Sequence, residues 1–429
     1  MSFSNIIQHF RRRILQPRPL PPLSQVLLIQ PSPPLLKRSC VNSSSLLLPS
    51  SQLTSRFSPK KYIKAFIIFS ILFGTSLILY EDSPSRRVNK AVQKGTQPKL
   101  NISSDEYYSR PQVLEPLKKI FTPHECSRSC YIIYGNEDIG KSTLIKMASR
   151  EVGQGVIYVD IPLPFNNYYF GIEFKKAMNI DSLNSDGYKE EWKVALSAFE
   201  RAAKVYKAKY GRPLVIIYDN VDRLIPRNTD ILDILQSSVT ESGNKGNYIA
   251  VFVCSGYSVT QRMSSRGHWT DIDYFEIGDL TEEESIDYLN QKNIREEEAR
   301  KIYELVGGYI LDLKKAAHDL FSGQSFEDIK KEFKFKVELK FRNARLLPGY
   351  GYYEVGRNII NILLSSGELC ASELWKSLNH SERDKLMGKN VFKYNPETHK
   401  ITFRSKSVES YERENSNLFI KKRLFSSHT

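Results

Sequence analysis

The nine residues Gly135-Asn136-Glu137-Asp138-Ile139-Gly140-Lys141-Ser142-Thr143 match the pattern G-x-x-x-x-G-K-[ST] at every fixed position. An apolar run, residues 131–134, precedes this stretch, and apolar residues at helical spacing follow it. The pattern therefore predicts a strand, a glycine-containing loop and a helix in direct succession. Such a unit belongs to an α/β fold, so it constrains the architecture of this chain more than any other feature.

All nine residues of this loop are predicted to bind a nucleotide. The glycines let the backbone curl so that successive N–H groups point at phosphate oxygens, and the following helix adds its positive dipole end. In this pattern Lys141 reaches the β- and γ-phosphates and is a candidate catalytic residue, while the Ser142 hydroxyl binds Mg²⁺. The alternative is a chance match in a glycine-containing turn, which the strand and helix on either side argue against.

A second apolar run, residues 213–222, ends in acidic residues. A buried run of this kind is typical of a central parallel strand, and ligands bind at the carboxyl ends of such strands. Asp219 is therefore predicted to hold Mg²⁺, or a water bound to it, opposite Ser142. Asp222 is predicted to polarise the attacking water. The alternative for both acids is a turn after the strand with a helix cap.

The strands on either side add weaker candidates. Residues 155–161 and 248–255 are predicted to be buried strands, and Ser255 at the tip of the second could sense the γ-phosphate or be a simple turn residue. Arg262 and Arg266 follow in a predicted loop or short helix. Each is a candidate arginine finger for a neighbouring subunit, with a solvated surface charge as the alternative.

The amino-terminal part of the chain has a different composition. Residues 1–80 contain ten Lys or Arg and no Asp or Glu. Residues 1–60 are predicted to be a disordered targeting leader of the mitochondrial type, and residues 62–80 a single transmembrane helix with one charge, Lys64. The alternatives are a generic basic tail and a helix buried in a soluble domain. Residues 81–104 are a predicted linker.

Charges beside the predicted span suggest its orientation. Lys60, Lys61 and Lys64 lie before it, and Glu81 and Asp82 follow it. The positive-inside rule then places the amino-terminal side in the matrix of a mitochondrion and the rest of the chain in the intermembrane space, anchored to the inner membrane. Basic residues beyond Asp82 and import routes that re-insert from the matrix favour the opposite orientation.

The order of these features resembles that of the archaeal-type ATPases, in the STAND branch of the AAA+-related P-loop ATPases. The resemblance rests on Arg110-Pro111, the loop at 135–143, the strand ends at 218–222 and 253–255, and the segment 275–284. It implies an α/β fold with a parallel sheet in which the nucleotide strand is central, a P-loop ATPase domain at 105–280, and a helical lid at 281–345. It also implies ATP and Mg²⁺ as cofactors.

This chain departs from the family pattern in two places. Asn220 stands where typical AAA+ enzymes have a glutamate after the strand aspartate. The segment Gly307-Gly308-Tyr309-Ile310 lacks the proline that the family's lid usually carries. Both departures are consistent with nucleotide binding and leave the rate of hydrolysis open.

The carboxyl-terminal third is predicted to be mostly helical. Thr281 and Glu284 form a capping-box pattern that starts a helix, and residues 296–306 form another that ends at Gly307. Residues 326–345 are predicted to be a charged helix or a strand edge. Residues 346–429 contain helices followed by two strands around an Asn-Pro turn, which resembles a winged helix.

Two classes of function follow. The first is a membrane-anchored ATPase that couples ATP binding or hydrolysis to remodelling or scaffolding of protein assemblies. Its expected partners are protein clients and further copies of the chain in a homo-oligomer. The second is a nucleic-acid-handling ATPase of organelle genome maintenance, and a third alternative is a sensor that binds nucleotide without hydrolysis. The first is favoured because the chain beyond residue 100 is nearly neutral, whereas duplex binding requires a basic face.

Overall fold

The computed structural model describes residues 68–70, 84–100, 108–124, 127–180, 190–225, 228–243, 245–265 and 272–416. All of them belong to one compact unit that begins at Phe66. The predicted leader and most of the predicted span at 62–80 lie outside these residues. Within the described ranges, no helix has both the length and the apolar character needed to cross a membrane.

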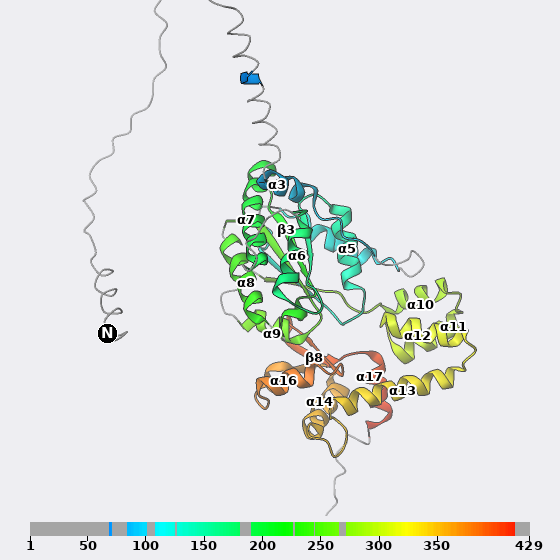
Figure 1. The fold of residues 1–429 in the computed structure, drawn as a ribbon. Helices are drawn as coiled ribbons and strands as arrows, with labels where there is room; N and C mark the ends of the chain where they lie inside the picture. Colours follow the sequence, from blue (N-terminus) through cyan, green and yellow to red (C-terminus); the bar gives the residue numbers. More distant parts are fainter. Residues whose placement is uncertain are drawn as a thin grey trace, which may run out of the picture. The chain divides into compact units, whose positions relative to one another are not determined.

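A five-stranded parallel sheet forms the centre of the part of the structure before the lid, residues 84–276 (Figure 1). Its strands are β1 (Cys130–Tyr134), β2 (Val156–Asp160), β3 (Leu214–Asp219), β4 (Tyr248–Cys254) and β5 (Ile272–Glu276). They lie in the order β2-β3-β4-β1-β5. The expectation that the nucleotide strand is central is wrong in detail, because β4 holds the middle position and β1 lies between β4 and the edge strand β5.

Each face of this sheet has its own hydrophobic core. Alternate residues of a strand point to opposite faces, so Ile216 and Tyr218 contribute to one core and Val215 and Ile217 to the other. The first face packs against α3 (Pro84–Lys94), α6 (Asn167–Ala177), α7 (Glu191–Tyr210), α8 (Thr229–Gly243) and α9 (Tyr257–Ser265). The second packs against α4 (Pro111–Ile120) and α5 (Lys141–Val152). Coverage on both faces explains why β3 and β4 are buried at every position.

A group of short helices, here called the lid, follows β5. It consists of α10 (Glu282–Gln291), α11 (Glu296–Val306) and α12 (Ile310–Phe321). The predicted capping box is present: the Thr281 hydroxyl accepts from the Glu284 amide, and the Glu284 carboxylate accepts from the Thr281 amide. The long helix α13 (Phe326–Asn343) contributes its first half to the core of the lid and its second half to the next core.

The remaining described residues form what we call the C-terminal module. Its elements are α14 (Tyr353–Ser366), β6 (Leu369–Cys370), α15 (Ala371–Trp375), α16 (His380–Met387), β7 (Phe392–Asn395), β8 (Lys400–Phe403) and α17 (Lys406–Glu414). The three strands form an antiparallel sheet in the order β6-β8-β7. β7 and β8 make the hairpin that the Asn-Pro turn predicts.

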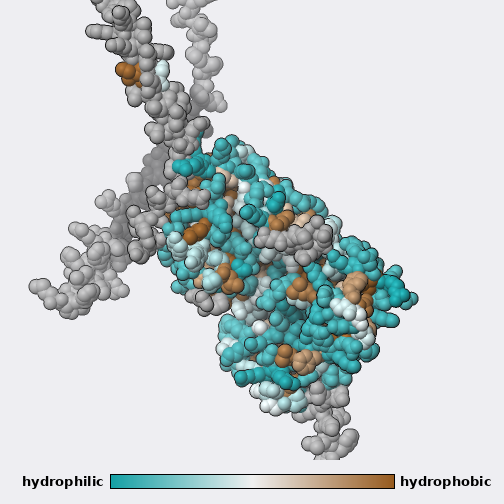
Figure 2. All heavy atoms as spheres, turned by 45° about the vertical axis from the view of Figure 1, so that its right-hand side comes forward, coloured by the Kyte–Doolittle hydropathy of each residue, from teal (hydrophilic) through white to brown (hydrophobic). Residues whose placement is uncertain are grey.

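The structure confirms the strands expected at 131–134, 155–161, 213–222 and 248–255, and the helix expected at 296–306. The segment 326–345 is a helix and not a strand edge. The molecular surface is largely hydrophilic on the face that Figure 2 shows, with apolar residues scattered over it.

Gly308 generates a prediction about how the lid is joined to the sheet. Its carbonyl accepts a hydrogen bond from the Leu280 amide (2.9 Å), and a methyl group added at 308 would lie 1.8 Å from the Leu280 carbonyl oxygen. Because two backbones would have to separate, we expect Gly308→Ala to lower the free energy of unfolding by about 1–3 kcal/mol. Denaturant or thermal unfolding would measure the change.

The matched control is Gly278→Ala. A methyl group at Gly278 meets no atom within 4 Å, so this variant should stay within about 0.5 kcal/mol of the wild type. Equal destabilisation by the two substitutions would contradict the close approach at Gly308.

Candidate nucleotide-binding site

The loop between β1 and α5 adopts a conformation that needs its two glycines. A side chain at Gly135 would collide with the Ile277 carbonyl oxygen, 2.1 Å from the position of an added methyl group. Gly140 has a φ of +88°, a left-handed conformation that other residues rarely adopt, and α5 begins directly after it. The loop therefore turns tightly around the amino-terminal end of α5, which the G-x-x-x-x-G-K-[ST] pattern predicts.

Lys141 points back into this loop. Its ammonium donates hydrogen bonds to the carbonyl oxygens of Gly135 (3.2 Å) and Asn136, and its side chain is buried. Burial lowers the pKa of Lys141, while the charges of Asp222 and Asp219 oppose this shift. The ammonium thus lies at the centre of the loop, where the phosphates of a nucleotide would bind.

Asp219 at the end of β3 is fully buried. Its carboxylate accepts hydrogen bonds from the Tyr158 hydroxyl (2.6 Å) and from the Asn220 amide (2.9 Å), and it also interacts with the Ser142 hydroxyl. Burial raises the pKa of Asp219, and these hydrogen bonds oppose the rise. The structure therefore brings Asp219 and Ser142 together, as the sequence predicts, and adds Tyr158, which sequence reasoning missed.

Ser142 and Asp219 fit a magnesium ion that is bound mainly through a nucleotide. Mg²⁺ prefers oxygen ligands and is usually held by one or two protein groups together with substrate phosphates, so a hydroxyl and a carboxylate suffice. The described residues contain no cluster of three or more His, Cys, Asp or Glu that could hold a metal ion. When bound, the ion would neutralise charge on the phosphates.

Asp222 forms hydrogen bonds that link the ends of two neighbouring strands. Its two carboxylate oxygens accept hydrogen bonds from the backbone amides of Ser255 (2.7 Å) and Gly256 (2.6 Å). Burial raises the pKa of Asp222, and these amides, followed by Lys141, oppose the rise. Asp222 therefore joins the end of β3 to the end of β4. That it polarises the attacking water stays a prediction, because each of its oxygens accepts one backbone N–H and keeps a second lone pair.

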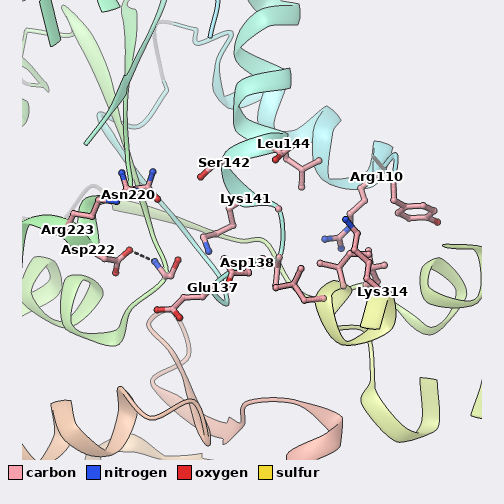
Figure 3. A pocket seen from close by; sticks show the side chains of 18 residues that line it. Arg110, Glu137, Asp138, Lys141, Ser142, Leu144, Asn220, Asp222, Arg223 and Lys314 are labelled. Carbon is pink, nitrogen blue, oxygen red and sulfur yellow. Dashed lines mark hydrogen bonds between the residues drawn. The ribbon is translucent and has the colours of Figure 1, made fainter. Parts of the chain in front are cut away.

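The predicted residues line one cavity of about 530 Å³ (Figure 3). The loop, the ends of β3 and β4, and the lid all contribute to its wall. Its lining includes Glu137, Asp138, Ile139, Gly140, Lys141, Ser142, Thr143, Asn220, Asp222, Ser255 and, from the lid, Ile310, Leu311 and Lys314. The volume lies in the usual range for small-molecule sites. Among the predicted residues, Gly135, Asn136 and Asp219 lie behind this lining.

Arg110 connects three parts of the structure beside this cavity. Its guanidinium donates to the Glu284 carboxylate (3.1 and 3.2 Å) and to the carbonyl oxygens of Gly278 (2.8 Å) and Asp279 (3.2 Å). Arg110 and Glu284 are both buried. In the sequence, only the Arg110-Pro111 pair indicated that this arginine matters. Its contact with Glu284 could not be predicted, because the two residues are 174 positions apart in the chain.

Of the two arginine-finger candidates, Arg262 lies within the described residues. Arg262 forms a two-pronged ion pair with Asp233 of α8, with nitrogen–oxygen distances of 3.2 and 2.7 Å. The structure thus gives Arg262 an internal partner, which favours a structural role. Arg266 lies outside the described residues.

Comparison with protein families gives a match within the region that contains this site. Residues 108–316 match a family described as "ATPase domain predominantly from Archaea". The match spans just under half of the chain. Among curated proteins, no sequence matches this chain.

Several solved structures are similar in fold. A Walker-type ATPase of Pyrococcus abyssi is 12% identical, with a TM-score of 0.48 over 73% of this chain and 98% of its own. A signal transduction ATPase with a tetratricopeptide repeat sensor from Pyrococcus horikoshii is 15% identical, with a TM-score of 0.34 over 75% of this chain and 44% of its own. Cdc6p of Pyrobaculum aerophilum is 12% identical, with a TM-score of 0.36 over 77% of this chain and 97% of its own.

The family match and the site geometry agree. The parallel sheet, the loop at the end of β1 and the matched residues 108–316 together define a P-loop ATPase-like domain.

The hydrogen bond from the Tyr158 hydroxyl should stabilise the charged form of Asp219. Since its hydrogen bond lowers the pKa of a carboxyl whose pKa burial raises, Tyr158→Phe should raise that pKa further. The variant should lose about 1–3 kcal/mol of unfolding free energy at pH 8, because the hydrogen bond from Tyr158 stabilises the ionised form of Asp219. This loss should shrink as the pH falls and Asp219 becomes protonated. Denaturant unfolding at pH 8 and pH 5 would test both expectations.

Tyr206→Phe is the matched control. The Tyr206 hydroxyl is also buried, but within the described part of the chain it has no hydrogen-bond partner. Removal of this hydroxyl should leave the free energy of unfolding unchanged at either pH. If both variants lost the same stability, the bond from Tyr158 to Asp219 would not be the cause.

Proposed function

We propose that this chain is a membrane-anchored P-loop ATPase that binds ATP with Mg²⁺ and uses its nucleotide state to remodel or scaffold a protein assembly. The observation that carries the proposal is the cavity of about 530 Å³, in which the phosphate loop, the strand ends and the lid meet. Lys141 and Ser142 would hold the phosphates and the metal, and Asp219 would support the metal from behind. Movement of the lid could then follow the occupancy of the site.

Slow hydrolysis fits the residues around the phosphates best. Asn220 replaces the glutamate of typical AAA+ enzymes, and its side-chain amide donates to Asp160 (2.8 Å). Asp222 binds two backbone amides with its two oxygens. Neither Asn220 nor Asp222 is therefore held solely for activating a water molecule. The site fits a switch that keeps its nucleotide for a long time better than an enzyme with rapid turnover.

The proposed membrane anchor and the proposed organelle rest on features of the amino-acid sequence. The acid-free leader and the apolar run at 62–80 support a single-pass anchor in the mitochondrial inner membrane, with the ATPase domain in the intermembrane space. The C-terminal module has the order helix, strand, two helices and hairpin, which supports a winged-helix-like fold. Because the chain beyond residue 100 is nearly neutral, we favour protein clients, including further copies of this chain, over nucleic acid for this module.

Substitution of Lys141 tests the proposed activity. We expect the full chain to bind and hydrolyse ATP, and Lys141→Ala to reduce both to background, because the ammonium that neutralises the phosphates is lost. Lys118→Ala is the control, since Lys118 lies on α4 and pairs with Glu151 (2.8 Å). Turnover of radiolabelled ATP would measure the outcome. Equal turnover by the wild type and Lys141→Ala would refute an ATPase activity of this site.

Protease protection tests the proposed location. With a tag at the carboxyl terminus, the tag should be protected in intact mitochondria and digested once the outer membrane is ruptured. A tag that is protected until the inner membrane is dissolved would place the ATPase domain in the matrix. A tag digested on intact mitochondria would exclude the inner membrane.

A further inference from the structure

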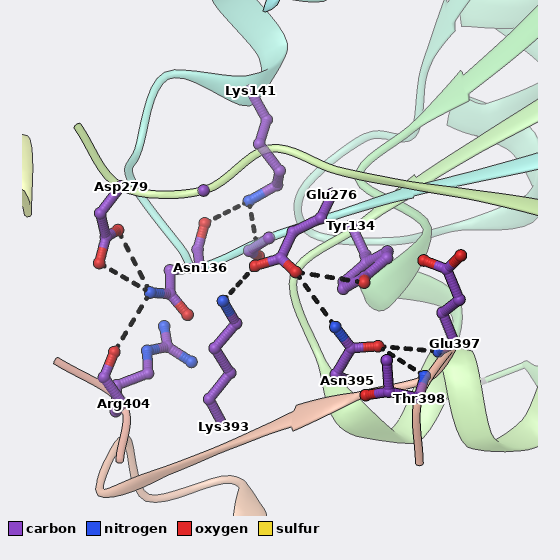
Figure 4. A network of polar contacts seen from close by, with 12 residues as sticks. Tyr134, Asn136, Lys141, Glu276, Asp279, Lys393, Asn395, Glu397, Thr398 and Arg404 are labelled. Carbon is purple, nitrogen blue, oxygen red and sulfur yellow. Dashed lines mark hydrogen bonds and ion pairs between the residues drawn. The ribbon is translucent and has the colours of Figure 1, made fainter. Parts of the chain in front are cut away.

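The amino ends of the parallel strands form an edge of the sheet that lies opposite the nucleotide cavity. Because β1 to β5 are parallel, their carboxyl ends meet at the phosphate loop and their amino ends meet at the other edge. The C-terminal module is bound at the carboxyl edge (Figure 4). There Glu276 of β5 accepts from Lys393 and from Asn395 (3.3 Å), and Asn136 donates to the carbonyl oxygen of Arg404 (3.4 Å). The amino edge is therefore a separate surface.

The segment that follows α3 lies along this amino edge. The Thr96 amide donates to the carbonyl oxygen of Val156 at the start of β2 (2.9 Å). Arg150, near the end of α5, donates to the carbonyl oxygen of Pro98 (3.2 Å). α3 itself contains four basic residues and no acidic residue. The chain thus reaches the amino edge through a basic helix.

The end of α7 and the loop before β4 extend this surface. Lys207 donates to the carbonyl oxygen of Lys245 (2.7 Å). Arg212, which lies just before β3, donates to the side chain of Gln154 in the turn before β2 (3.5 Å). We call the combined region the amino-edge surface, and it consists of residues 94–100, 150–155, 207–212 and 245–247.

The amino-edge surface is strongly basic. Its four segments contain seven basic residues and one acidic residue, Glu151, which pairs with Lys118 of α4 (2.8 Å). Within the described part of the chain, none of the seven forms an ion pair: Lys94, Lys99, Arg150, Lys207, Lys209, Arg212 and Lys245. The apolar side chains of Leu100 and Tyr210 are exposed among them. Such a combination fits a partner with anionic groups in front of an apolar layer, as in a lipid bilayer.

The predicted transmembrane span would hold this surface close to a bilayer. The span is predicted to end at residue 80 and α3 begins at Pro84, so the connection reaches at most about 14 Å. This proximity does not depend on which side of the membrane the ATPase domain faces. A tether this short gives the lipid headgroups a high effective concentration at the amino edge, so a weak attraction is enough to orient the domain.

We propose that the amino-edge surface docks on the bilayer in which the chain is anchored, with its cations on the phosphates of anionic lipids. Leu100 and Tyr210 would lie at the level of the headgroups. This inference rests on the proposed function, because it needs the membrane anchor. Docking at the amino edge directs the carboxyl edge, with the nucleotide cavity and the C-terminal module, away from the membrane and toward protein partners. Each basic residue near an anionic membrane strengthens binding by about fivefold.

Lysine labelling of the full chain in lipid nanodiscs tests this docking. Discs of phosphatidylcholine alone would be compared with discs that contain about 30% phosphatidylglycerol. In the anionic discs, an acylating reagent should modify Lys94, Lys99, Lys209 and Lys245 about 5- to 10-fold more slowly, because the headgroups shield them. Mass spectrometry gives a rate for each lysine. Three exposed lysines of the C-terminal module should react equally in both discs: Lys376, Lys385 and Lys389.

A triple variant tests whether the charges cause the protection. Lys94→Gln, Lys99→Gln and Lys245→Gln together remove three exposed side chains that form no hydrogen bond or ion pair with the described residues. Thermal unfolding should therefore be unchanged, while Lys209 should react equally fast in both discs. The matched control carries three charges fewer in the C-terminal module and should keep the protection of Lys209: Lys376→Gln, Lys385→Gln and Lys389→Gln.

The outcomes separate docking from anchoring. If the full chain enters both kinds of disc and the four lysines react equally in the two, docking is overturned and the membrane anchor stands. Protection of these lysines by a duplex oligonucleotide, and not by anionic lipid, would also overturn docking and make the surface a nucleic-acid site. If the full chain enters neither kind of disc, the proposed anchor fails and the inference fails with it.

Discussion

The buried ion pair between Arg110 and Glu284 is the contact on which the position of the lid depends. Arg110 comes just before α4, Glu284 is in the first turn of α10, and Gly278 and Asp279, which Arg110 also binds, end the segment after β5. Glu284 additionally caps its own helix through Thr281. Loss of either charge would leave the other buried without its ion-pair partner, which commonly costs several kcal/mol. One arginine thus fixes the lid relative to the sheet and completes the cavity wall.

The parts of the site that depend on local chain geometry could be predicted from the sequence. The phosphate loop is a continuous pattern between a strand and a helix, and Asp219 ends an unbroken apolar run, so both were assigned correctly to the ends of β1 and β3. The hydrogen bonds from Ser255 and Gly256 to Asp222 could not be predicted, because they depend on the order of the strands in the sheet. That order places β3 next to β4, which no pattern within one strand reveals.

Two of the elements that were not predicted, α6 and β6, have weak local signals. Near its start α6 has two tyrosines and a phenylalanine, residues with lower helix propensity, and β6 has only two residues. Both form because neighbouring parts of the fold hold them: Phe170 and Phe174 fill the core on one face of the sheet, and β6 pairs with β8. The contact between Asn136 and Arg404 spans 268 residues and could be found only from the structure.

The backbone conformation of Asn220 limits which residue can follow Asp219. Its φ of +63° is left-handed, a conformation that asparagine tolerates and that glutamate adopts at a cost of about 1 kcal/mol or more. A glutamate there would also lose the hydrogen bond to Asp160. The substitution Asn220→Glu alone would therefore not give a stable copy of the acidic pair of typical AAA+ enzymes. The turn after β3 would also have to change.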